Sequence, residues 1–488
     1  MYLNAIMKQA ALAAAALRCR ELRSLPLPVL WRMNRLLQDE KLVRLGETVV
    51  VNSFLPPLGT RAFSSMAAGL AAVRRGRAVP VSGYIAVTDR CPCRCWHCSS
   101  AGRAPGEMPA EVLERLIREL QALGAAIVGF TGGEPLERPD LERLIAAVDE
   151  RSTSILFTSG AGMNAARAES LKRSGLFGAA VSLDSADGAE HDAMRGRPGA
   201  FDAAVAAARA ARRAGLYTML QAVATPALCE PAALAAYLEL ARDLDAHEIR
   251  LLEPAPAGRL LGRCDACVSA GARRAALCRL HVESNRSRSM PKVTAFAHIE
   301  SAGLYGCGAG FQHLYVDSAG NVCPCDFAPL SFGNVRAESL AAIWDRMSVV
   351  FSKPGCRCFA LRNSAALARE SGGRLPVPFE DVADRLRFPA ASELPGFYRA
   401  IGWKPKEVRT GRRAWTGLRT AVRSLARAAC CLGVLIAAAA FMRWPDRLAA
   451  LDMRLPAGMA TVVGRAADME SWLGFLRVEQ AGRPQVMP

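Results

Sequence analysis

Six short apolar runs alternate with helical segments between residues 84 and 252, and this alternation limits the fold more than any other feature of the chain. In the segment Pro109–Leu123, for example, apolar residues recur on one helical face and Gly124 follows its end. Strands that are separated by helices pair in parallel, and a series of such units forms an α/β barrel. We therefore expect a partial (β/α)6 TIM-type barrel with the strands Tyr84–Thr88, Ala125–Phe130, Ser154–Phe157, Gly178–Leu183, Thr218–Ala224 and Glu248–Leu252.

Three further regions surround the expected barrel, which occupies residues 81–260. Residues 1–80 hold Ala- and Leu-rich segments that predict a helical N-terminal region without visible chemistry. Residues 261–375 are rich in cysteine and predict a separate C-terminal domain. Residues 376–488 form a helical C-terminal extension that contains the uncharged apolar segment 428–442.

The apolar segment 428–442 has fifteen residues, fewer than the ~20 that a membrane-spanning helix usually needs. Its arginine-rich flanks suit a helix that lies on an anionic membrane surface, and a helix buried against the barrel is the alternative. Near the N-terminus, the run Ala10–Leu17 is short for a signal peptide and no small-residue cleavage site follows it. This run predicts an Ala-rich helix.

The net charge and the cysteine content limit which binding partners and which cellular compartment we expect. The net charge is +17, but only seven of the 62 basic residues are Lys, and the Arg excess runs through the whole chain without a known nucleic-acid module. We therefore expect no nucleic acid as a partner. The sixteen cysteines cluster at the spacings of metal ligands, which indicates a reducing compartment. We expect a cytoplasmic protein, with peripheral membrane contact through 428–442 as an open alternative.

A short loop directly after the first expected strand carries Cys91, Cys95 and Cys98 in the spacing C-x3-C-x2-C. Three thiolates can hold three corners of a 4Fe–4S cluster and leave one iron open for another ligand. Cys93 is a fourth thiol in the same loop, so a closed structural zinc site is the alternative. His97 precedes the last cysteine and could pack against or hydrogen-bond to a cofactor.

The sequence Thr131-Gly132-Gly133-Glu134-Pro135 follows the second expected strand. The two glycines allow the backbone to approach a ligand closely, and the carboxylate of Glu134 can receive an ammonium group. Parallel strands of a barrel place their carboxyl ends on one rim, so this segment should lie beside the cysteine loop. An open iron beside such a cradle describes a site for S-adenosylmethionine.

The order and separation of these two motifs resemble those of the radical SAM superfamily. Cys91, Cys95 and Cys98 match its cluster motif, with His97 at the usually aromatic position, and Gly132 to Pro135 match its GGEP motif. The resemblance implies an enzyme that donates one electron from a 4Fe–4S cluster to S-adenosylmethionine and releases a 5′-deoxyadenosyl radical. This radical would abstract hydrogen from a substrate, and a reductant such as flavodoxin or ferredoxin would supply the electron.

The segment after the fourth expected strand resembles the part of the same family that helps to hold the ribose of the cofactor. It contains Ser182 and Asp184, followed by His191 and Arg195. The alternatives are a strand-end cap at Ser182, a helix cap at Asp184 and a satisfied surface residue at His191. The sequence identifies no residue that acts on the substrate itself.

A second group of cysteines follows the expected barrel. An alternating run and a turn predict a β-hairpin that brings Cys307 and Cys325 together, and Cys356 and Cys358 would complete a four-thiolate set for an auxiliary 4Fe–4S cluster. The group resembles the SPASM and twitch extensions of radical SAM enzymes, although it lacks some cysteines of the seven-cysteine SPASM pattern. Cys323 could replace one of the four ligands, and a structural zinc ion is the alternative occupant.

Other features leave the substrate and the class of protein open. Cys264, Cys267 and Cys278 have the spacing C-x2-C-x10-C, for which we expect unliganded or accessory thiols. The SPASM-like group favours a peptide substrate, whereas the apolar segment 428–442 favours a lipid or another small molecule. The competing class is a non-enzymatic zinc-binding scaffold or interaction protein.

Overall fold

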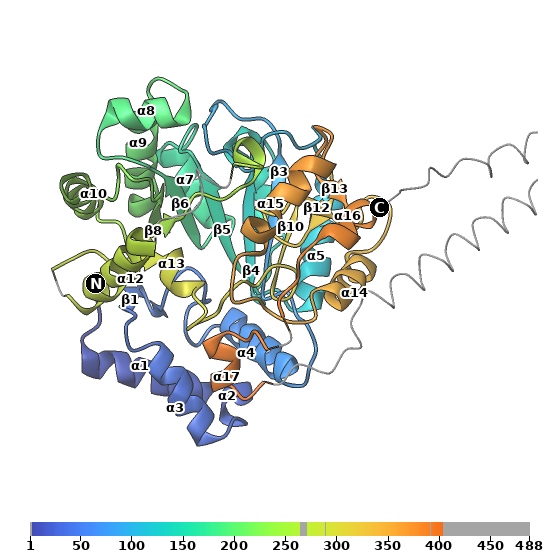
Figure 1. Ribbon diagram of the computed structural model, residues 1–488. Helices are drawn as coiled ribbons and strands as arrows, with labels where there is room; N and C mark the ends of the chain where they lie inside the picture. The colour runs from blue at the N-terminus through green and yellow to red at the C-terminus, as the bar shows by residue number, and fades with distance from the viewer. Residues whose placement is uncertain (1, 264–270, 288, 391, 404–488) are drawn as a thin grey trace, which may run out of the picture. The chain divides into compact units, whose positions relative to one another are not determined.

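A nine-stranded, mostly parallel sheet lies at the centre of the computed structural model, which describes residues 2–263, 271–287, 289–390 and 392–403 (Figure 1). The strand order is β11-β10-β3-β4-β5-β6-β7-β8-β9, and only the β10–β11 pair is antiparallel. The first seven strands of the parallel series in chain order are β3 (Ser82–Thr88), β4 (Ile127–Gly132), β5 (Thr153–Thr158), β6 (Gly178–Ser182), β7 (Tyr217–Val223), β8 (Glu248–Leu252) and β9 (Val293–Ala295).

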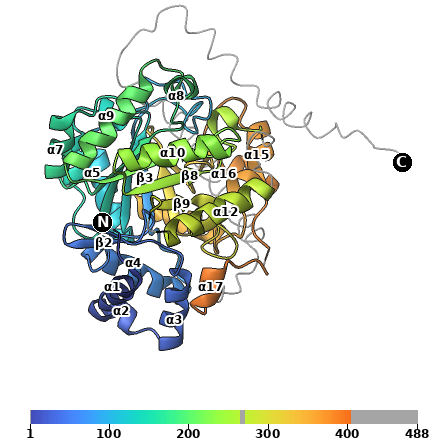
Figure 2. The ribbon, with the colours of Figure 1, turned by 90° about the vertical axis from the view of Figure 1, so that its left-hand side faces the viewer.

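Helices connect these strands in the expected alternation and lie on the outside of the sheet (Figure 2). Their spacing of apolar residues buries one face of each helix; α5, for example, buries Leu113, Leu116 and Leu120. The predicted α/β fold is therefore confirmed. The helices are α5 (Ala110–Leu123), α6 (Leu141–Ala146), α7 (Ala165–Arg173), α8 (Gly188–Arg195), α9 (Ala200–Arg213), α10 (Pro231–Asp243) and α12 (Gly271–Arg286).

Two elements differ in length from the expectation for local reasons. The second barrel strand begins at Ile127 instead of Ala125, because the Ala125 N–H closes the end of α5 on the Leu120 carbonyl at 3.0 Å. Helix α6 ends at Ala146, because the N–H groups of the next two residues, Ala147 and Val148, donate to carbonyls three residues earlier instead of four. The short helix α8 was not expected, and the Asp187 carboxylate caps it by accepting from the Glu190 N–H.

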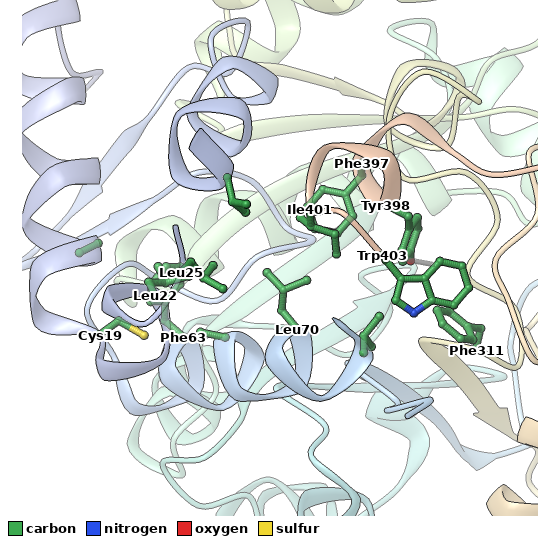
Figure 3. Close-up of a cluster of buried hydrophobic side chains, with 14 residues drawn as sticks. Cys19, Leu22, Leu25, Phe63, Leu70, Phe311, Phe397, Tyr398, Ile401 and Trp403 are labelled. Carbon is green, nitrogen blue, oxygen red and sulfur yellow. The ribbon is translucent and has the colours of Figure 1, made fainter. Parts of the chain in front are cut away.

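The N-terminal region is helical and packs on residues from the far end of the described chain. It comprises α1 (Ala5–Arg18), α2 (Arg20–Arg23), α3 (Leu27–Leu36), β1 (Val43–Leu45), β2 (Thr48–Val50) and α4 (Arg61–Arg74). Figure 3 shows Leu22, Phe63 and Leu70 of this region in one apolar cluster with α17 (Gly396–Ala400) and Trp403. Burial of this cluster joins the N-terminal helices to the cysteine-rich region, because Phe311 also belongs to it.

The predicted β-hairpin is present and extends the barrel sheet. Strand β10 (His313–Val316) pairs with β11 (Val322–Cys323) on one side and in parallel with β3 on the other. The cysteine-rich region is therefore hydrogen-bonded directly to the strand that leads into the first cysteine loop. Its other elements are α13 (Phe296–Ile299), β12 (Leu330–Ser331), α14 (Leu340–Val350), α15 (Phe359–Glu370), β13 (Val377–Pro378) and α16 (Phe379–Val382).

Some predictions fall on residues that the structure does not describe. Cys264, Cys267 and the apolar segment 428–442 lie outside the described ranges. Within those ranges, none of the helices combines the length and the hydropathy that crossing a membrane would require.

Candidate active site

The loop after β3 is held in place by three other parts of the barrel rim. The Arg94 N–H donates to the carbonyl of Arg195 at the end of α8 at 2.8 Å. The Glu134 N–H donates to the Arg90 carbonyl at 2.7 Å, and the Arg259 N–H donates to the Cys98 carbonyl at 3.1 Å. These contacts fix the loop at the carboxyl ends of the strands, where the predicted barrel would place an active site.

The thiols of this loop line one cavity of about 440 Å³ at the barrel rim. Cys91, Cys95 and Cys98 all belong to its wall, as predicted, and Cys93 lies among them. The thiol of Cys93 is within hydrogen-bonding reach of those of Cys91 and Cys95. The hydrogen bond with Cys93 is the largest cause that raises the pKa of Cys95, and burial adds to it. The structure therefore places the three predicted ligands and the fourth thiol on one cavity wall, although no three His, Cys, Asp or Glu side chains of the described residues are grouped closely enough to hold a single metal ion.

Both glycines of the second motif are required by close packing against the cysteine loop. Gly132 has a φ of +137°, and a Cβ there would lie 2.3 Å from the Thr88 carbonyl oxygen. A Cβ on Gly133 would lie 2.1 Å from the Arg90 carbonyl oxygen. Both glycines also line the cavity, where the absence of side chains leaves room for a ligand, and the Gly133 N–H donates to the Thr88 carbonyl at 2.8 Å.

The carboxylate of Glu134 has partners within the protein. It is fully buried and accepts hydrogen bonds from Thr158 Oγ1 at 2.6 Å, from Ser159 Oγ at 2.6 Å and from the Ser159 N–H at 2.7 Å. Burial raises its pKa, and these hydrogen bonds oppose the shift. In this structure the carboxylate joins the ends of β4 and β5. An ammonium contact from Glu134 stays a prediction.

A buried ion pair connects the fourth strand to the cysteine loop. Arg195 Nη2 lies 2.6 Å from the Asp184 carboxylate, and Arg195 Nη1 lies 3.7 Å from Cys95 Sγ. Burial alone would raise the pKa of Asp184, but the Arg195 guanidinium holds it below its ordinary value. A fixed cation beside the thiols favours their anionic form. The sequence pointed to Arg195 only through a resembling segment, because its distance to Cys95 depends on the fold of α8.

The other predicted residues at this rim separate into two groups. Ser182 and His97 line the cavity. Burial lowers the pKa of His97 to about 4, so the ring is neutral at pH 7, and its Nδ1 is buried without a hydrogen-bond partner. His191 is instead fully buried and accepts the Asp184 N–H on Nδ1 at 3.0 Å. It is a structural residue, and the alternative of a surface position is wrong.

Three of the four predicted auxiliary thiols meet at a second cavity of about 610 Å³. Cys307, Cys325 and Cys358 line it. A hydrogen bond from the Cys358 thiol is the largest cause that lowers the pKa of Cys307 to about 6. Cys356 is not among the residues that line this cavity, and its charged neighbours are Glu393, Arg399 and Lys353.

Cys323 is occupied elsewhere in the core. It is fully buried, and Arg103 Nη1 donates to its sulfur at 3.4 Å. Burial raises its pKa to about 11, although the Arg103 charge opposes this shift. Cys323 is not among the residues that line the cavity of the three thiols, and it packs with Ala86 and Tyr315.

Comparison with known proteins agrees with this arrangement. The family model described as the radical SAM superfamily matches residues 85–227, and that of the SPASM iron–sulfur cluster-binding domain matches residues 307–363. The PqqA peptide cyclase of Streptomyces rochei is 31% identical over 278 residues, which are 54% of this chain and 75% of the relative. The chain belongs to the radical SAM superfamily.

The chain is also similar to a heme synthase and to a solved structure. The AdoMet-dependent heme synthase of Methanosarcina barkeri is 26% identical over 287 residues, 54% of this chain and 81% of the relative. The crystal structure of Streptococcus suis SuiB bound to the precursor peptide SuiA is 19% identical, with a TM-score of 0.47 over 57% of this chain and 67% of SuiB.

The residues at the two cavities fit the groups that the family requires, which are a 4Fe–4S cluster, S-adenosylmethionine and an auxiliary iron–sulfur cluster. The rim cavity offers clustered thiols, a fixed cation and a glycine backbone without side chains. The second cavity offers three further thiols. The alternative of a non-enzymatic zinc-binding scaffold finds no support.

Proposed function

We propose that this radical SAM enzyme cleaves S-adenosylmethionine at the rim cavity and abstracts a hydrogen atom from a peptide or small-molecule substrate that enters the same cavity. One observation carries the proposal: the thiols of the Cys91–Cys98 loop and the backbone of Gly132 and Gly133 line one space at the carboxyl ends of the strands. The bound cluster would supply the electron for this cleavage.

The proposed roles follow from the position of each group. Cys91, Cys95 and Cys98 hold the cluster, and Cys93 remains a spare thiol. Gly132 and Gly133 leave room on the cavity wall for the methionine part of the cofactor, while Ser182 lies on the wall where a ribose could bind. Arg195 stabilises the thiolates by its charge, since Asp184 fixes the guanidinium beside Cys95.

The second cavity supports an auxiliary cluster that accepts or relays an electron. Cys307, Cys325 and Cys358 are proposed as its ligands, and Cys356 would need to turn toward the cavity to become the fourth. Removal of a hydrogen atom leaves a substrate radical, and a nearby one-electron acceptor would allow an oxidised product to form.

The partners follow from the same chemistry. The reaction needs an external reductant, for which we propose a flavodoxin or a ferredoxin. A reducing cytoplasm would keep the twelve described free thiols available for clusters. Peripheral membrane contact through residues 428–442 stays a proposal on residues outside the described ranges.

Anaerobic reconstitution with iron and sulfide tests the proposed function. The reduced wild-type protein should convert S-adenosylmethionine to 5′-deoxyadenosine, and a variant in which Cys91, Cys95 and Cys98 are all replaced by Ala should not. Zinc in the rim cavity and no cleavage by the iron-loaded wild-type protein would overturn the proposal.

A further inference from the structure

A row of polar side chains crosses four neighbouring strands inside the barrel. Ser182 of β6 is paired in register with Gln221 of β7, Gln221 with Arg250 of β8, and Arg250 with Thr294 of β9. Register partners of parallel strands face the same side of a sheet. Ser182, Gln221 and Arg250 line the rim cavity, so this face is the barrel interior.

Three members of this row bury polar atoms without a hydrogen-bond partner. These atoms are Nε and Nη1 of Arg250, Oε1 of Gln221 and Oγ1 of Thr294. Arg250 is 2% exposed, and no carboxylate of the described residues forms an ion pair with it. Its polar neighbour is the Tyr84 hydroxyl. A buried cation without a counter-charge is strongly unfavourable, so Arg250 favours an anion from outside the chain. The free Oε1 of Gln221 is an acceptor and favours a hydrogen-bond donor instead.

Aromatic rings surround the guanidinium and limit the shape of that anion. Its Cζ atom lies 5.1 Å from the ring centre of Phe157, 5.2 Å from that of Phe296 and 5.7 Å from that of Phe54. Such rings stabilise a cation but offer no hydrogen-bond acceptor. The free Nε–H and Nη1–H groups lie on different edges of the planar guanidinium, so each can donate one charge-assisted hydrogen bond to an anionic oxygen.

The second cavity, which lies beside this row, has an apolar part as well as the auxiliary thiols Cys307, Cys325 and Cys358 and the Glu300 carboxyl group; we call its apolar part the apolar chamber. Tyr84, Phe296 and Phe327 line both the rim cavity and the second cavity of about 610 Å³. Phe54 lines the second cavity as well. Asp326 also lines both cavities, and its carboxylate is paired with His313 Nε2 at 3.1 Å. The remaining wall includes side chains from helices α1, α3 and α4 and from the segment before α4, namely Leu12, Leu30, Phe63, Met66, Leu70 and Leu58.

We propose that the substrate of this enzyme is a carboxylic acid with an apolar chain, whose carboxylate is bound by Arg250 and whose chain occupies the apolar chamber. The Thr294 hydroxyl can donate to the same carboxylate, whereas Gln221 Oε1 can only accept from a donor elsewhere on the substrate. The proposal rests on the proposed function, because it names the substrate class of that same site and selects the small molecule over the peptide. Arg250 is a binding residue for the substrate, separate from Arg195 at the thiols.

Calorimetric titration of the cluster-loaded enzyme with S-adenosylmethionine present tests this proposal, with decanoate, decanol and shorter carboxylates as probes. Decanoate should bind about 100-fold more tightly than decanol, since charge-assisted hydrogen bonds are lost with the alcohol. Affinity should rise about fourfold per methylene from hexanoate to decanoate, the fold-change for each buried CH₂. Equal binding of decanoate and decanol, or no dependence on chain length, would overturn the proposal without the use of any variant.

Arg250→Met is the corresponding variant, and Arg212→Met on α9 is the matched control for loss of an arginine outside the barrel. Arg250→Met should abolish the preference for decanoate over decanol and should not lower the melting temperature, because it removes an unpaired buried charge. Thr294→Val should weaken decanoate binding several-fold. A loss of affinity for S-adenosylmethionine in Arg250→Met, with decanoate binding unchanged, would assign Arg250 to the cofactor and overturn the proposal.

Failure of the inference and failure of the proposed function give different results. Reductive formation of 5′-deoxyadenosine is measured in the same preparations without decanoate. Cleavage of S-adenosylmethionine without selective carboxylate binding overturns the substrate class alone. Selective carboxylate binding without cleavage overturns the radical chemistry and leaves the carboxylate site in place.

Discussion

The two cysteine groups of this protein reach the same kind of cavity by different routes. The first four thiols lie within eight residues, Cys91 to Cys98, on one loop that neighbouring strands hold at the rim. The thiols of the second cavity come from positions 307, 325 and 358, on separate segments. In a contiguous loop the spacing decides which thiols meet, whereas in the second group hairpin and helix packing decide it.

The contiguous loop gives the largest expected effect. Cys95→Ala should lower reductive cleavage of S-adenosylmethionine to the background of iron-free protein, because it removes one of three ligands that no other segment replaces. Cys93→Ala, the matched control two residues away, should retain cleavage. The measurement is 5′-deoxyadenosine formation after anaerobic reconstitution, and the reverse result for the two variants would reassign the ligands.

The second group should keep its iron when the first is removed. A protein with Cys91, Cys95 and Cys98 replaced by Ala should still bind about four irons, held at the second cavity. In that background Cys325→Ala should lose the iron of the second cavity. If Cys356→Ala keeps this iron, the site has three thiolate ligands; if Cys356→Ala loses it, the predicted four-thiolate set is correct. Iron and zinc analysis with absorption spectra gives the result, and zinc in place of iron would make the second group structural.

Glu134 tests whether the rim depends on hydrogen bonds within the chain. Glu134→Ala leaves the buried Thr158 hydroxyl and the Ser159 N–H without their acceptor, so the free energy of unfolding should fall by about 2 kcal/mol. Glu134→Gln should restore part of this loss. Thermal or denaturant unfolding measures it, together with the affinity for S-adenosylmethionine.

The predicted ammonium contact of Glu134 is separated from this structural role by comparison of the two quantities. If Glu134→Ala weakens cofactor binding in proportion to the lost carboxylate while the free energy of unfolding stays unchanged, the carboxylate contacts the ammonium directly. An unchanged cofactor affinity would remove Glu134 from the binding site.

Cys323 should give the smallest effect. Its sulfur packs in the core and accepts a hydrogen bond from Arg103, so Cys323→Ala should cost about 1–2 kcal/mol of unfolding free energy and leave the iron content unchanged. Cys325→Ala is the matched comparison two residues away, where iron should be lost. Loss of iron in Cys323→Ala would return Cys323 to the ligand set.

Local patterns in the sequence determined the barrel strands, most of its helices and the first thiol set. The strand Glu248–Leu252 was predicted with its observed bounds, and the hairpin before Cys325 was predicted from its alternation and turn. These features depend on periods of two or 3.6 residues and on short spacings, which a sequence displays directly. The motif Gly132-Gly133-Glu134 was found from the sequence because its residues are contiguous.

Only the tertiary structure decided which distant groups meet. It placed Arg195 against Cys95, lined the second cavity with Cys307, Cys325 and Cys358 but not with Cys356, and paired the Glu134 carboxylate with Thr158 and Ser159. It also aligned Gln221, Arg250 and Thr294 in one row, although each lies in a different strand. The physical reason is that strand register and helix packing set these distances, and both depend on the burial of the whole core, which no local pattern encodes.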